Sequence, residues 1–175
     1  PHNFIELLRA QVSLLKGGSA ELYPDFPQGG RIDVSEYDDG RGKIRVRAMI
    51  EKVSGAQKLV IREVPYTTTT TSLIASIESA VQKGKVSVST INDFTTEKVE
   101  IELHLSRGAS AETVIDQLYA HTDCEVSISS NIVVIRNERP VEITVSEYLK
   151  EFTGQLKRQI KAELDSAYIY LAMSA

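Results

Sequence analysis

Regular alternation of hydrophobic and polar residues predicts most of the β-structure in this chain. In the segment 99–105, apolar residues occupy every second position, with glutamates and a histidine between them. A strand sends alternate side chains to opposite faces, so this segment should form a strand with one buried face. Similar patterns predict strands over 44–53 and 58–65, joined as a hairpin, over 85–94, and one or two more over 124–136.

Apolar residues at helical spacing predict three helices between these strands. Each is expected to begin at a residue type that favours the N-cap: Asn3, Thr70 or Thr71, and Ser110. Gly17 and Gly18 should end the first helix, and Gly84 the second.

A longer helix is predicted to start near Ser146. Its apolar positions are spaced by threes and fours, which is typical of one side of a coiled coil. They are Leu149, Phe152, Leu156, Ile160, Leu164, Ala167 and Leu171. The whole order predicts an α+β fold with a mainly antiparallel sheet flanked by helices, ending in this long helix. We expect one domain over 1–145 and a separate helix over 146–175.

Charge is distributed unevenly along the chain. The formal net charge is −4, which argues against a general nucleic-acid binder. However, the segment 41–58 holds six basic residues and one acidic residue, whereas the segment 1–40 holds three basic and seven acidic residues. The sequence therefore places a basic ribbon next to an acidic segment, and a ribbon of this kind can meet a polyanion.

Within that ribbon, basic residues occupy every second position of a predicted strand. They are Arg41, Lys43, Arg45 and Arg47. A strand would present them on one face at ~6.5–7 Å intervals, which is comparable to the spacing of phosphates along a DNA strand. The prediction of DNA contact rests mainly on the first three, and Arg31, beyond the Gly29–Gly30 turn, is a further candidate. The alternative is a protein-interaction domain whose basic strand is only a solvated sheet face.

Nothing in the sequence predicts an enzyme site in this chain. No Walker A loop or dinucleotide motif is present, and the three histidines, His2, His104 and His121, lie on separate elements without metal-ligand spacing. Cys124, the only cysteine, is expected to be a small buried strand residue, which suits a reducing cytosol. No apolar run approaches the ~20 residues of a membrane span. We expect no metal, no cofactor and no membrane contact.

Five stretches, in order, resemble the A subunit of bacterial type IIA DNA topoisomerases, the DNA gyrase and topoisomerase IV family. They cover roughly residues 1–150. The stretches are "PHNFIELL" (1–8), "YPDFPQGG" (23–30), "GRGKIRVRA" (40–48), "IREVPY" (61–66) and "LYAHTDCEVSISSNIVVI" (118–135).

The resemblance implies that this region is the tower domain, a non-catalytic part that binds DNA and supports the cut duplex during ATP-dependent double-strand passage. In that family the nucleophilic tyrosine follows an arginine upstream of the "PHN" motif. None of the seven tyrosines here follows an arginine, so the chain alone should be inactive. The resemblance further implies an A2B2 assembly in the bacterial cytoplasm at the nucleoid, with Mg and ATP used by the B subunit.

Past Ser146 the resemblance fades. The segment 146–175 is expected to be either the start of the family's coiled coil or a tail foreign to it, and we expect the chain to be part of a longer protein. The tail is also similar to the first helix of ferritin-like proteins, with Glu163 at the place of an iron ligand. A di-iron bundle would need Glu-x-x-His pairs, which the sequence lacks. The sequence does not separate gyrase from topoisomerase IV.

Overall fold

The structure, a computed structural model, describes residues 2–174, without the side chains of residues 171, 172 and 174. Leu171, the last position of the predicted stripe, is therefore outside the described side chains. The chain forms two compact units. Unit 1 holds the segment up to Asp25, Tyr37–Gly42 and the segment from Ser130 onward. Unit 2 holds Phe26–Glu36 and Lys43–Ser129.

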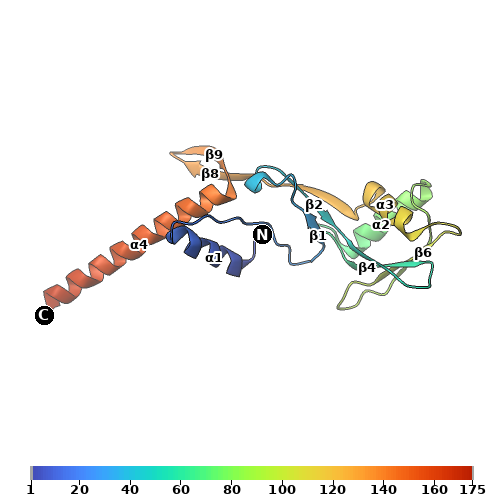
Figure 1. Ribbon diagram of the computed structural model, residues 1–175, viewed down its shortest axis with the longest axis horizontal. Helices are drawn as coiled ribbons and strands as arrows, with labels where there is room; N and C mark the ends of the chain where they lie inside the picture. Colours follow the sequence, from blue (N-terminus) through green and yellow to red (C-terminus); the bar gives the residue numbers. More distant parts are fainter. Residues whose placement is uncertain (1, 175) are drawn as a thin grey trace. The chain divides into compact units, whose positions relative to one another are not determined.

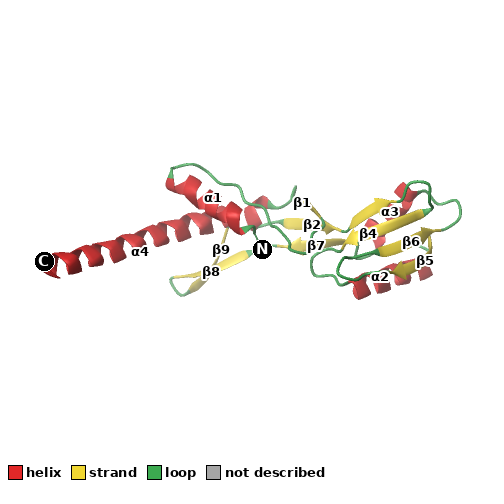
Figure 2. Cartoon of the chain, turned by 90° about the horizontal axis from the view of Figure 1, so that it is seen from below, coloured by secondary structure: helices red, strands yellow, loops and turns green. Residues whose placement is uncertain are grey.

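Unit 2 contains two antiparallel sheets. Sheet A has the order β1 (Arg31–Asp33), β2 (Lys43–Arg47), β7 (Glu125–Ser129), so that β2 is its central strand (Figure 2). Sheet B has the order β3 (Met49–Lys52), β4 (Lys58–Glu63), β6 (Ile101–Leu105), β5 (Val88–Asp93). The α+β class and the mainly antiparallel pairing that the sequence predicts are confirmed.

Two helices share one hydrophobic core with sheet B. Helix α2 (Thr70–Gln82) and helix α3 (Ala111–His121) lie above β4 and β6 in Figure 1. Their inward side chains pack with those of the sheet because both elements bury one apolar face. The fully buried members include Leu59, Ile61, Leu73, Ile77, Leu103, Val114 and Leu118.

Unit 1 contains the remaining helices and a hairpin. Helix α1 (Phe4–Leu15) contacts helix α4 (Val145–Ser174), and strands β8 (Ile132–Arg136) and β9 (Arg139–Ile143) form a two-stranded sheet. A short 3-10 turn, η1 (Asp38–Gly40), lies at the start of α4. The predicted apolar face of α1 is exposed in this chain, for example at Phe4 and Leu15.

Capping agrees with the sequence pattern to within two residues. The Asn3 side chain accepts hydrogen bonds from the backbone of Ile5 and Glu6, and Ser110 accepts one from Thr113. The N-cap of helix α2 is Thr69, one residue before the earlier of the two predicted caps, Thr70 and Thr71, and Thr69 forms a reciprocal capping box with Ser72.

One predicted strand was wrong, and strand β9 was not predicted. The expected strand over 44–53 is broken at Ala48 into β2 and β3, which belong to different sheets. Ala48 is fully buried, and its backbone donates to the Cys124 carbonyl and accepts from the Tyr119 hydroxyl, which fixes the crossing. Strand β9 was missed because it contains Pro140, a residue disfavoured inside strands except at edges, first positions and bulges, and both strands of this hairpin are edges.

The sequence predicts one domain over 1–145 and a separate helix over 146–175 of this chain. The two units are groupings within this chain and do not decide it, so that division stays a prediction.

Candidate nucleic-acid interface

Strand β2 has one buried and one open face, as its alternation predicts. Ile44 and Val46 are buried at 1% and 0% exposure, while Lys43 is exposed and Arg45 and Arg47 are half-buried. The burial of the two aliphatic side chains fixes the strand's orientation, since each contributes roughly 1.5–3 kcal/mol on removal from water. The three cations therefore lie on the open face of sheet A.

The register of sheet A shows which side chains surround each cation. Residues directly opposite one another in an antiparallel pair share a face. Lys43 is opposite Ser129, and Arg45 has Asp33 on one side and Ser127 on the other. Arg47 has Arg31 on one side and Glu125 on the other. The open face thus brings together four of the five predicted cations, Arg31, Lys43, Arg45 and Arg47.

Arg47 is held by contacts within unit 2. Its Nε donates to Glu125 Oε2, and its guanidinium carbon lies 5.0 Å from the centre of the Tyr119 ring. The hydrogen bond to Glu125 raises the pKa of Arg47. Tyr119 in turn donates from its hydroxyl to the Ala48 carbonyl at 3.0 Å, and burial raises the pKa of Tyr119. Arg47 therefore ties β2 to β7 and α3.

Arg45 is paired with two carboxylates. Its guanidinium lies 3.2 Å from Asp33 and 3.5 Å from Glu36, and all three side chains are substantially exposed. Hydrogen bonds from Ser35, with a smaller contribution from Arg45, lower the pKa of Asp33. Exposed pairs of this kind are weak, so an incoming phosphate can compete for the guanidinium.

Lys43 forms no ion pair with any residue that the structure describes, and the same holds for Arg31. Arg41 belongs to unit 1, where it lies 3.7 Å from Glu147 of α4. Arg41 is therefore described apart from the cations of sheet A. That all five contact DNA stays a prediction.

Several polar members of this surface were missed from the sequence. They are Asp33, Glu36, Glu125, Ser127 and Ser129. A signal for three of them was present: the segment 125–129 alternates a polar residue with an aliphatic one, which places Glu125, Ser127 and Ser129 on one face of a strand. Which strand lies beside it could not be read from that pattern.

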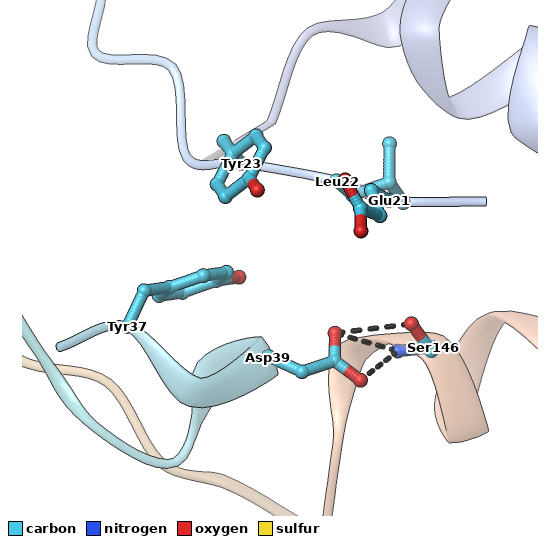
Figure 3. A pocket seen from close by; sticks show the side chains of 6 residues that line it. All are labelled: Glu21, Leu22, Tyr23, Tyr37, Asp39 and Ser146. Atoms are coloured by element: carbon cyan, nitrogen blue, oxygen red, sulfur yellow. Dashed lines mark hydrogen bonds between the residues drawn. The ribbon is translucent and has the colours of Figure 1, made fainter. Parts of the chain in front are cut away.

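A separate cavity of about 270 Å³ lies in unit 1, and two of its lining residues, Asp39 and Ser146, form hydrogen bonds that cap helix α4 (Figure 3). Asp39, at a positive φ of 51°, accepts hydrogen bonds from the Ser146 hydroxyl at 3.0 Å and the Ser146 backbone at 3.3 Å. A carboxylate at this position satisfies orphan donors and complements the helix dipole of α4. Tyr23 and Tyr37 face each other across the cavity, with 5.9 Å between their ring centres. Burial raises the pKa of Tyr37 to about 12.

No group of three or more metal-ligating side chains occurs among the described residues. Cys124 is fully buried, as the sequence predicts, and burial raises the pKa of its thiol to about 11, which keeps the thiol protonated at neutral pH. Among the described helices, none is both long enough and apolar enough to cross a lipid bilayer.

A basic open sheet face on an α+β fold is typical of modules that contact polyanions. The family model for the A subunit of DNA gyrase/topoisomerase IV matches residues 1–169, which includes most of α4. The chain therefore belongs to this family.

Individual relatives agree with the family match. The chain is 48% identical over 165 residues to the A subunit of DNA topoisomerase 4 from Borreliella burgdorferi, covering 94% of this chain and 26% of that protein. It is 29% identical over 189 residues to the DNA gyrase A subunit of Lawsonia intracellularis and 30% identical over 190 residues to that of Chlamydia pneumoniae, each time covering 95% of this chain and 23% of the relative. The chain thus spans about a quarter of the length of these relatives.

Proposed function

We propose that this chain is a non-catalytic, DNA-binding and structural region, the tower, of the A subunit of a type IIA DNA topoisomerase. In the intact enzyme it would support the cleaved duplex during ATP-dependent double-strand passage. Family membership supports the parent enzyme, and the named relatives are A subunits of topoisomerase 4 and of gyrase. The observation that carries the DNA role is the open face of sheet A, where Lys43 and Arg45 stand exposed or half-buried above a buried aliphatic face.

The contacts would be to the phosphate backbone. Cations at alternate positions of one strand can follow successive phosphates without reading base edges, which suits an enzyme that acts at many sites. Arg31 would add charge on the same face, and Arg41 would add charge in unit 1. Arg47 would contribute less because Glu125 and Tyr119 already engage it.

The rest of the enzyme would supply the chemistry. No arginine–tyrosine pair is present in this sequence, so the nucleophile would come from another part of the same polypeptide. Mg and ATP would be used by the B subunit, and the assembly would be A2B2 in the bacterial cytoplasm, associated with the nucleoid.

The alternative is a protein-interaction domain whose cations are only solvated. The ion pairs of Arg45 and Arg47 favour it, since internal carboxylates already balance part of the charge. Duplex binding across a salt series separates the two functions, because the affinity of phosphate contacts falls with salt by about one slope unit for each contact.

The decisive variant is Lys43→Ala/Arg45→Ala, with Lys85→Ala/Lys98→Ala as a control of equal charge on exposed residues of unit 2 outside sheet A. We expect the first variant to bind more weakly and to lower the salt slope by about two units, and the control to keep the wild-type slope. If the Lys43→Ala/Arg45→Ala variant stays folded and has the same salt slope and affinity as wild type, the protein-interaction domain is favoured instead.

A further inference from the structure

Beside Lys43 and Arg45, strand β7 presents two serines on the same open face. We propose that Ser127 and Ser129 donate hydrogen bonds to phosphate oxygens of the DNA strand whose charge Lys43 and Arg45 neutralise. This inference rests on the proposed function, since it names further residues of the same surface.

The register of the sheet places each hydroxyl next to a cation. Ser129 is opposite Lys43 and Ser127 is opposite Arg45, and Cβ atoms of directly opposite residues lie ~4.5–5.5 Å apart. The two serines are themselves two strand residues apart, which is ~6.5–7 Å. Val126 and Ile128 alternate with them and belong to the other face. The result is a rectangle of two cations and two hydroxyls.

Both hydroxyls are available for a ligand. Ser127 and Ser129 are exposed, and neither side chain has a hydrogen-bond partner among the residues that the structure describes. Other serines are already engaged: the side chain of Ser72 caps α2, and that of Ser89 bonds to the His104 carbonyl. The β7 serines therefore have no visible role in holding the fold together.

The surroundings decide the direction from which a phosphate can approach. On the β1 side, Asp33 and Glu36 flank Arg45 and repel an anion. On the β7 side, neutral serines flank both Arg45 and Lys43. At the far end of β7, Glu125 is paired with Arg47. The accessible anion site is thus bounded by carboxylates and opens over Ser127 and Ser129.

Serine suits this position chemically. A hydroxyl is a compact donor that bonds to phosphate oxygens without a net charge, and serine contacts of this kind position a duplex without specifying its sequence. An uncharged donor releases no counterion, so its loss should weaken binding equally at every salt concentration. The lysine and arginine contacts, by contrast, set the salt slope.

The test compares Ser127→Ala/Ser129→Ala with wild type in fluorescence anisotropy titrations of a labelled duplex across a salt series. We expect roughly tenfold weaker binding at each salt concentration, from two lost hydrogen bonds, with an unchanged slope. Ser127→Thr/Ser129→Thr retains the hydroxyls and should bind within about twofold of wild type. Ser54→Ala/Thr90→Ala is the control, since both residues are exposed in unit 2 outside sheet A.

Each other result overturns the proposal. Wild-type affinity in the alanine variant would exclude the hydroxyls as ligands, even if Lys43→Ala/Arg45→Ala still lowered the slope and so upheld the proposed function. Equal weakening in the threonine variant would show that the hydroxyl is not the donor, and a changed slope in the alanine variant would show that the cations had moved. If wild type binds no duplex, or the cation variant changes nothing, the proposed function itself fails.

Discussion

Arg45 has two sets of possible partners, the carboxylates that it contacts and the phosphates proposed for it. Its distances to Asp33 and Glu36 are those of ordinary surface ion pairs, and such pairs are easily exchanged. The carboxylates therefore act as competitors within the chain: they hold the guanidinium over the sheet and at the same time lower the attraction of this face for an anion.

Removing the competitors should strengthen DNA binding. We expect Asp33→Asn/Glu36→Gln to raise duplex affinity about tenfold at low salt and less at high salt, because the change is electrostatic. The asparagine amide oxygen can still accept the hydrogen bond that Asp33 accepts from the Ser35 backbone, so the turn should persist. Binding titrations measure the effect.

The control for this prediction is Glu78→Gln/Glu97→Gln, which changes the net charge equally at exposed positions of unit 2 outside sheet A. A gain in affinity no larger than that of the control would mean that only net charge matters and that the two carboxylates do not compete for Arg45.

The distal turns of helix α4 depend for their stability mainly on the helix itself. Its apolar positions from Phe152 to Leu164 are between 39% and 55% exposed in this chain, so little burial stabilises the distal turns. Propensity then matters more than packing. Gly154 lies within the continuous helix, and a Cβ built there would meet only the end of the Arg158 side chain at 3.8 Å.

Gly154→Ala should therefore stabilise α4 by about 1 kcal/mol. Hydrogen exchange reports this directly. In wild type, amides after Gln155 should exchange faster than those of Ile101–Leu105. In the variant, the same helix amides should exchange more slowly than they do in wild type. Measurements need a dilute, verified monomer, because association would bury the same stripe. Equal protection of the helix and β6 in wild type would contradict the exposure of the distal turns.

At Gly30, in contrast to Gly154, substitution by alanine should destabilise the protein. Gly30 has a φ of +92°, and a Cβ there would lie 2.9 Å from the Arg47 carbonyl, so Gly30→Ala should destabilise unit 2 and disturb the start of β1. If both substitutions had the same sign of effect on unfolding, the backbone argument for the two positions would fail.

At the scale of the whole molecule, the chain lacks a nucleophile in the expected sequence context and has no metal cluster among its described residues. Incubated alone with supercoiled plasmid and magnesium, it should give no relaxed product and no covalent protein–DNA adduct. Electrophoresis after denaturation detects both. A tyrosine-linked adduct would refute the non-catalytic role, and a type IIA topoisomerase holoenzyme of known activity serves as the positive control.

The sequence by itself determined what depends on neighbours along the chain. The caps at Asn3 and Ser110, the buried alternation at Ile44 and Val46, and the buried Cys124 all follow from local spacing and residue type. These features are predictable because a helix turn and a strand pleat each involve only a few consecutive residues.

Only the tertiary structure decided which strands lie together. The break at Ala48 depends on Cys124 and Tyr119, which are more than 70 positions away in the chain. Likewise, the pairing of β2 with β1 and β7 is what places carboxylates on one side of Arg45 and a serine on the other. Alternation along one strand fixes the face of each residue, but the neighbour across the sheet is set by register between distant segments.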